Sequence, residues 1–112
     1  MKKKLKLGYK LKTDNKINFL EDLYLTIEKK SKSKDAKSYT RKLLKEGKNK
    51  IAQKVGEESI ELISDYLSGS KKRVVEEASD LIYHLLVMLY SKKITLKDIK
   101  KELLRRKNVR RK

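Results

Sequence analysis

Apolar residues recur at the spacing of an α-helix over most of the chain. They keep this period from 19 to 29, directly after Asn18, a residue type that caps helix N-termini. The polar run at 30–37 predicts a loop. A shorter helix is expected to begin at Ser38 or Thr40 and to end at Gly47. The first half of the chain is therefore predicted to be helical.

Two long helices are predicted in the middle of the chain, over 48–68 and 71–91, with Ser70 as the cap of the second. The stretch 81–90 is apolar nearly all round, apart from one histidine. Such a helix has to be buried on several sides, and we expect a second subunit to provide part of the cover. Apolar residues at helical spacing and tyrosines in apolar segments are expected in the core: Ile51, Val55, Leu62, Tyr66, Tyr83 and Tyr90.

The two ends of the chain have different patterns. Residues 4–12 alternate between lysine and apolar residues, a period of two that suits a strand, but no other segment shows it. We therefore interpret 1–16 as a flexible basic arm. Thr95 is expected to cap a last helix, which is followed by a basic tail at 106–112. A chain of 112 residues suits one domain, placed at 17–105.

The charge of the chain is strongly positive, with 32 Lys and Arg against 15 Asp and Glu and a formal net charge of +17. The excess is concentrated at the two ends, so a basic helical nucleic-acid-binding protein is one alternative interpretation. However, 26 of the 32 basic residues are lysine, which matches phosphate geometry less well than arginine. A lysine-rich composition alone would produce equally basic ends without any binding partner. Nucleic acid is therefore not the expected partner.

The composition also bears on compartment and membrane association. The chain has no cysteine, which excludes disulfides and cysteine-ligated zinc and suits a cytoplasmic location. No apolar run approaches the roughly 20 residues of a membrane span, so no membrane partner is expected.

Two acidic clusters lie inside the predicted long helices: Glu57, Glu58 and Glu61 in the first, and Glu76, Glu77 and Asp80 in the second. Acidic residues at i and i+3 on a helix lie about 5–6 Å apart and repel each other, unless a cation lies between them. Both clusters fall along an edge of the buried helix face, so a short turn between the helices can bring them together. Carboxylate oxygens suit hard cations such as magnesium or manganese. The alternative is a solvated surface on which glutamates pair with lysines.

The order of these acids resembles that of the all-α, MazG-like nucleotide pyrophosphohydrolases. The Ser-Tyr-Thr at 38–40 and the Lys-Val-Gly-Glu-Glu at 54–58 narrow the resemblance to the phosphoribosyl-ATP pyrophosphohydrolases of histidine biosynthesis. Further matching stretches lie at 19–23 and 80–87, and the resemblance covers about residues 17–105. A MazG-like enzyme that acts on other nucleoside triphosphates is the alternative within the same superfamily.

The resemblance implies a reaction in which water cleaves phosphoribosyl-ATP to phosphoribosyl-AMP and pyrophosphate, with magnesium or manganese as the cofactor. It implies Glu58, Glu61, Glu77 and Asp80 as metal ligands, and Glu57 as a further ligand or the base. Glu57 and Glu58 are thus the candidate catalytic residues. Candidates for contacts with the substrate, either with its phosphates or with its base, are Lys42, Lys48, Lys50, Lys54 and Tyr39.

The implied fold is an all-α, MazG-like helical bundle, in which two long antiparallel helices are completed by a second subunit in a homodimer. The cyclohydrolase of the next step uses cysteine and histidine zinc ligands in the related fused enzymes, and we expect it to be a separate protein here. His84 is the single histidine of the chain and is interpreted as a hydrogen-bonded interior residue rather than a zinc ligand.

Overall fold

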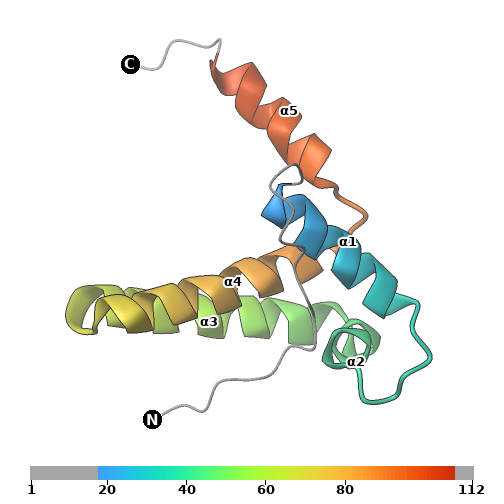
Figure 1. Cartoon of the computed structure of the whole chain (residues 1–112), viewed down its shortest axis with the longest axis horizontal. Coiled ribbons are helices and arrows are strands. Elements are labelled where there is room, and N and C mark those ends of the chain that lie inside the picture. Colours follow the sequence, from blue (N-terminus) through green and yellow to red (C-terminus); the bar gives the residue numbers. More distant parts are fainter. Residues whose placement is uncertain (1–17, 108–112) are drawn as a thin grey trace.

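The computed structural model describes residues 18–107, which form five α-helices and no strand (Figure 1). The all-α prediction is confirmed. The predicted arm at 1–16 and residues 108–112 lie outside the described part, whereas residues 106 and 107 of the predicted tail continue the last helix. The helices are α1 (Phe19–Ser31), α2 (Tyr39–Glu46), α3 (Lys48–Ser68), α4 (Lys71–Ser91) and α5 (Leu96–Lys107).

Local side-chain caps set the start of four helices. The side chains of Asn18, Ser38 and Ser70 each accept a hydrogen bond from a backbone N–H in the first turn of α1, α2 and α4. Thr95 and Asp98 form a reciprocal pair at the start of α5, in which each backbone N–H donates to the other side chain. These bonds satisfy N–H groups that have no acceptor within the helix. The predicted starts are confirmed, and α1 continues two residues beyond its predicted end.

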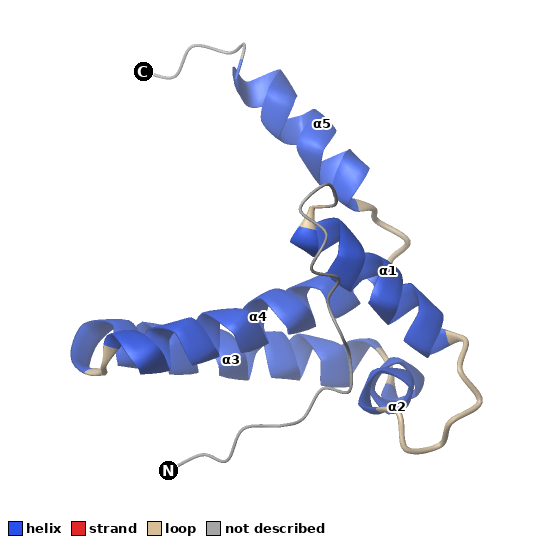
Figure 2. Cartoon of the chain, viewed as in Figure 1, coloured by secondary structure: helices blue, strands red, loops and turns tan. Residues whose placement is uncertain are grey.

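The long helices α3 and α4 lie side by side and antiparallel, and they form an extended hairpin (Figure 2). Helix α1 packs on α4 and α2, and α2 also contacts α3, so the core lies at the open end of the hairpin. Helix α5 projects away from the other helices and contains no buried residue. None of the described helices has the length and hydropathy that a membrane span requires. The buried apolar residues are Leu23, Tyr24 and Ile27 in α1, Leu43 in α2, Ile51 in α3, and Tyr83, Leu86 and Val87 in α4.

The distribution of buried and exposed apolar residues differs from the prediction. Within 81–90 the chain's own helices cover most of the apolar surface, and Leu85 is the residue left exposed, at 40%. The argument that this stretch needs a second subunit for its burial is therefore wrong. The prediction of Tyr66 as a core residue is also wrong, because its side chain is 75% exposed. On α3, Ile60, Ile63 and Leu67 are more exposed than Leu85.

The turn between α3 and α4 depends on Gly69. Its N–H donates to the carbonyl of Asp65 at 2.7 Å, and a Cβ at this position would lie 2.9 Å from that oxygen and 2.6 Å from Asp65 Oδ1. We expect Gly69→Ala to lower the free energy of unfolding by about 1–3 kcal/mol, because backbone atoms must shift to admit the methyl group. Urea unfolding followed by circular dichroism measures this change.

Gly56, inside α3, provides the matched control. A Cβ at this position meets no atom within 4 Å outside the neighbouring residues and the adjoining backbone of α3. Gly56→Ala is expected to raise the free energy of unfolding by up to about 1 kcal/mol, since alanine is the better helix former. Equal effects of the two substitutions would contradict the steric explanation for Gly69.

Candidate metal centre

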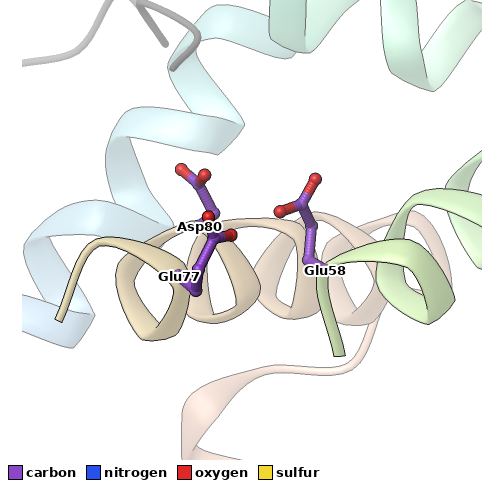
Figure 3. Close-up of side chains that lie close together, drawn as sticks. All are labelled: Glu58, Glu77 and Asp80. Atoms are coloured by element: carbon purple, nitrogen blue, oxygen red, sulfur yellow. The ribbon is translucent and has the colours of Figure 1, made fainter. Parts of the chain in front are cut away.

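The antiparallel hairpin brings the two acidic clusters together. Glu58 and Asp80 each lie eleven residues from Gly69 in the sequence, and Glu61 and Glu77 each lie eight residues from it. One carboxylate oxygen from each of Glu58, Glu77 and Asp80 lies within 4.8 Å of the others, and Figure 3 shows the three side chains projecting to the same side of the helices. The predicted convergence of acids from both helices is present.

A second group of acids adjoins the first and extends toward the turn. One oxygen each of Glu61, Asp65 and Glu77 also lies within 4.8 Å of the others, so Glu77 belongs to both groups. Asp65 had not been singled out from the sequence, since a lone aspartate on a long helix resembles ordinary surface. Its spacing of four residues after Glu61 and seven after Glu58 is the signal that it continues their line along α3.

The two glutamates at the centre of this line are almost completely buried, with Glu58 1% and Glu77 0% exposed. Burying a carboxylate is costly unless a positive group compensates for it. Each lies beside a basic residue of its own helix: Lys54 Nζ lies 3.6 Å from Glu58 Oε2, and Arg73 Nη2 lies 3.3 Å from Glu77 Oε2. With Asp80 beside them, these acids concentrate negative charge in a place with little water. Such a place favours a bound cation.

Glu57 lies apart from both groups of converging oxygens. Its side chain is 49% exposed and is 3.4 Å from Lys54 Nζ. Gln53 donates a hydrogen bond of 2.9 Å to Glu57 Oε2, and this bond lowers the pKa of Glu57. The structure therefore places Glu57 at the rim, beside the buried Glu58, and its role as ligand or base stays a prediction.

The predicted substrate-binding lysines differ in their distance from the acids. Lys54 lies at the site, with a side chain only 16% exposed. Lys50 is partly buried one turn before it on α3. Lys42 on α2 and Lys48 at the start of α3 are exposed and form no ion pair within residues 18–107. Of the four lysines, Lys54 is the one that the structure brings into contact with the acids.

His84 lies on α4 and forms a hydrogen bond with Tyr39 of α2. Its Nδ1 lies 2.8 Å from the carbonyl oxygen of Asp80 and its Nε2 lies 2.8 Å from Tyr39 Oη. A carbonyl can only accept, so Nδ1 carries the proton and Nε2 accepts from the tyrosine hydroxyl. Burial lowers the pKa of His84 and raises the pKa of Tyr39, which keeps both neutral. The prediction of an interior, hydrogen-bonded histidine is confirmed.

The hydrogen bond between Tyr39 and His84 gives a stability prediction. Tyr39→Phe removes the donor and leaves a buried ring nitrogen without it, which we expect to cost about 1–3 kcal/mol in the free energy of unfolding. Thermal and urea unfolding measure the loss. Tyr66→Phe is the control, because Tyr66 is 75% exposed, and it should change stability by less than about 0.5 kcal/mol. Equal stability of the two variants would contradict this role of Tyr39.

Comparisons with known proteins agree on one family. Residues 20–107 match the family described as phosphoribosyl-ATP pyrophosphohydrolase. A phosphoribosyl-ATP pyrophosphatase of Sulfolobus acidocaldarius is 49% identical over 89 residues, which are 80% of this chain and 94% of that protein. One from Metallosphaera sedula is 45% identical over 87 residues, 78% of this chain and 94% of that protein. A histidine biosynthesis bifunctional protein of Thermotoga maritima is 36% identical over 102 residues, 91% of this chain but 52% of that protein.

Proposed function

Since the chain belongs to the phosphoribosyl-ATP pyrophosphohydrolase family, we propose that it hydrolyses phosphoribosyl-ATP to phosphoribosyl-AMP and pyrophosphate, with magnesium held by its buried carboxylates. The match over 20–107 supports the reaction and includes both acidic clusters. The convergence of Glu58, Glu77 and Asp80 supports the metal. The unit proposed to carry the activity is the region 17–105.

The donor chemistry of the site fits magnesium. Every member of both groups is a carboxylate, and oxygen ligands of high charge suit hard cations such as magnesium or manganese. Both ring nitrogens of His84 are hydrogen-bonded, so this histidine is not a ligand of the proposed metal ion. In this proposal the ion would be held by Glu58, Glu77 and Asp80. Glu61 belongs to the adjoining group and would lie beside this site. When bound, magnesium would neutralise phosphate charge and lower the pKa of water.

The residues around the acids have complementary roles in this proposal. Lys54 borders the site and offers an ammonium group to the negatively charged polyphosphate. Glu57 has a lowered pKa and is ionised at neutral pH, the form that can accept a proton from water. Lys42, Lys48 and Lys50 lie before Lys54 in the chain and would contact the outer part of the substrate.

We also propose that the chain forms a homodimer through the face of the hairpin that its own helices leave uncovered. Ile60, Ile63 and Leu67 follow one another at helical spacing on α3 and are 69%, 57% and 74% exposed. Val75 and Leu85 on α4 are 57% and 40% exposed. Soluble monomers rarely leave large contiguous apolar patches uncovered, so these residues favour an interface with a second copy.

The proposed activity is tested by measuring pyrophosphate release from phosphoribosyl-ATP, from ATP and from a panel of other nucleoside triphosphates. Each substrate is assayed with magnesium, with manganese and with excess EDTA. We expect rapid release from phosphoribosyl-ATP with either metal and none with EDTA. Comparable kcat/KM values for ATP and phosphoribosyl-ATP would favour the broader MazG-like activity. Undiminished release in EDTA would contradict the metal.

A further inference from the structure

Lys54 lies between two glutamates of α3 that differ in their exposure. Its Nζ lies 3.4 Å from Glu57 Oε1 and 3.6 Å from Glu58 Oε2. Glu58 is buried and belongs to the first acidic group, whereas Glu57 is half exposed at the rim. The Lys54 side chain is itself largely buried. One ammonium group therefore contacts both a proposed metal ligand and a carboxylate outside the metal site.

The ammonium group of Lys54 and a divalent ion compete for Glu58. Magnesium takes its oxygen ligands at about 2.0–2.1 Å, so an ion bound to Glu58 Oε2 would lie within about 6 Å of Lys54 Nζ in its observed position. Two cations so close together in a place with little water repel each other strongly. Binding of the ion therefore favours movement of the ammonium group away from Glu58.

A lysine side chain can make this movement without any change in the helix. Its ammonium group is a compact charge at the end of a flexible four-carbon chain. Glu57 is already within 3.4 Å of Lys54 Nζ and offers a carboxylate nearer to the solvent. A magnesium ion held by carboxylates also binds substrate phosphates, which would bring further negative charge to the same place.

Arg73 is the other basic residue in contact with the first acidic group, through Glu77. Its further contacts are Asp65 and Glu76, whose side chains are 19% and 31% exposed. The outer contact of Lys54 is 49% exposed. Of the two basic residues, Lys54 is therefore the one with a partner at the rim of the site.

We propose that Lys54 takes the place of the metal ion at Glu58 in the protein without metal, and that binding of the ion releases its ammonium group to the polyphosphate of the substrate. This inference rests on the proposed function, because it takes the metal site at Glu58, Glu77 and Asp80 as given. Lys54 then weakens the binding of the metal and strengthens the binding of the substrate. A residue that only maintained the structure of the site would not have these opposite effects.

The two effects are tested by removing the charge of Lys54. Manganese is titrated into the full-length protein without substrate, and electron paramagnetic resonance measures the free ion. We expect Lys54→Met to lower the Kd for manganese at least about fivefold and to raise the KM for phosphoribosyl-ATP, at saturating magnesium, at least about tenfold. Lys72→Met is the matched control, because Lys72 is exposed on α4. It should leave both constants within about twofold of the wild type.

A measurement on the wild type does not depend on how a variant folds. Acetic anhydride acetylates accessible lysine amines, and mass spectrometry gives the rate at each lysine. We expect magnesium, without substrate, to raise the rate at Lys54 at least about threefold, because its amine would leave the buried Glu58 for the rim. The rate at the exposed Lys72 should not change.

Each outcome bears on one step of the inference. An unchanged labelling rate at Lys54, or an equal or higher Kd for manganese in a folded Lys54→Met, would overturn the competition for Glu58. An unchanged KM would overturn the release of the ammonium group to the substrate. These results would leave the proposed function intact. Absence of manganese binding in the wild type would contradict the metal site, together with the inference, and the pyrophosphate assay would then test the hydrolase activity separately.

Discussion

Replacing Glu77 with glutamine is expected to lower turnover of phosphoribosyl-ATP by at least about 100-fold and to remove the rise in melting temperature that magnesium causes. Glu77 is 0% exposed and belongs to both acidic groups, so its loss weakens the whole proposed site. A ligand that binds only the folded state stabilises it by about 2.7 kcal/mol at 100 times its Kd. Melting curves with magnesium and with EDTA, alongside turnover, test both effects.

The same substitution should leave the metal-free protein at least as stable as the wild type. Glutamine retains the size of the side chain and removes one of several clustered negative charges, while Arg73 keeps its contacts with Asp65 and Glu76. Glu76→Gln is the control, because Glu76 contacts Arg73 but belongs to neither acidic group. Wild-type turnover and an unchanged magnesium shift in Glu77→Gln would show that the acids do not hold the catalytic metal.

Introducing an aspartate at Ile63 is expected to raise the dissociation constant of the proposed homodimer by at least about 100-fold, because a charge would be buried in an apolar interface. The monomer should keep its helical content, since the Ile63 side chain is already 57% exposed in the single chain. Sedimentation velocity over a range of concentrations measures the dissociation constant, and circular dichroism checks the fold.

Leu25→Asp is the comparison for this experiment. Leu25 lies on α1 and not on either helix of the hairpin, and it is 50% exposed. This variant should associate as the wild type does. A wild-type protein that sediments as a monomer at several hundred micromolar would rule out the dimer, whatever the variants do.

The starts of the helices were predictable because their causes are local. A serine, threonine or asparagine that precedes a helical pattern satisfies N–H groups within three residues of itself, and no distant contact is needed. Ser38, Ser70 and Thr95 each mark a helix start that the structure contains. The end of α1 was less predictable, because its last turn is polar and resembles the loop that follows.

Burial was harder to predict, since periodicity identifies an apolar face without showing what covers it. Tyr66 has the spacing of the core residues of α3, but it lies toward the turn, where α1 and α2 do not reach. Conversely, the apolar end of α4 is covered by α1 and α2. Both errors concern which helices meet at which end of the hairpin, and this is a property of tertiary structure.

The acidic residues of the site could be predicted from the sequence, but the basic residues that contact them could not. The spacing of Glu58 and Glu61 and of Glu77 and Asp80 indicated convergence, because each pair lies on one helix face. Arg73 is one of 32 basic residues and had no feature of its own within a single helix. Its contact with Asp65 depends on the turn, which places Arg73 of α4 beside α3.

The difference between Glu57 and Glu58 could not be predicted either. Adjacent residues of a helix differ by about 100° in direction, and only packing decides that Glu58 is buried while Glu57 is not.

The short connection between α3 and α4 also constrains how the length of this chain can change. Because this connection holds the two helices in register, one residue inserted within α4 between Arg73 and Glu77 would rotate Glu77 by about 100° and advance it by about 1.5 Å, so Glu77 would no longer face Glu61. Lengthening the hairpin by about seven residues, nearly one turn in each helix, would restore the phase. The segment between α1 and α2 carries no such periodicity. Its length can change by one residue at a time, whereas the length of the hairpin can change only by whole helical turns.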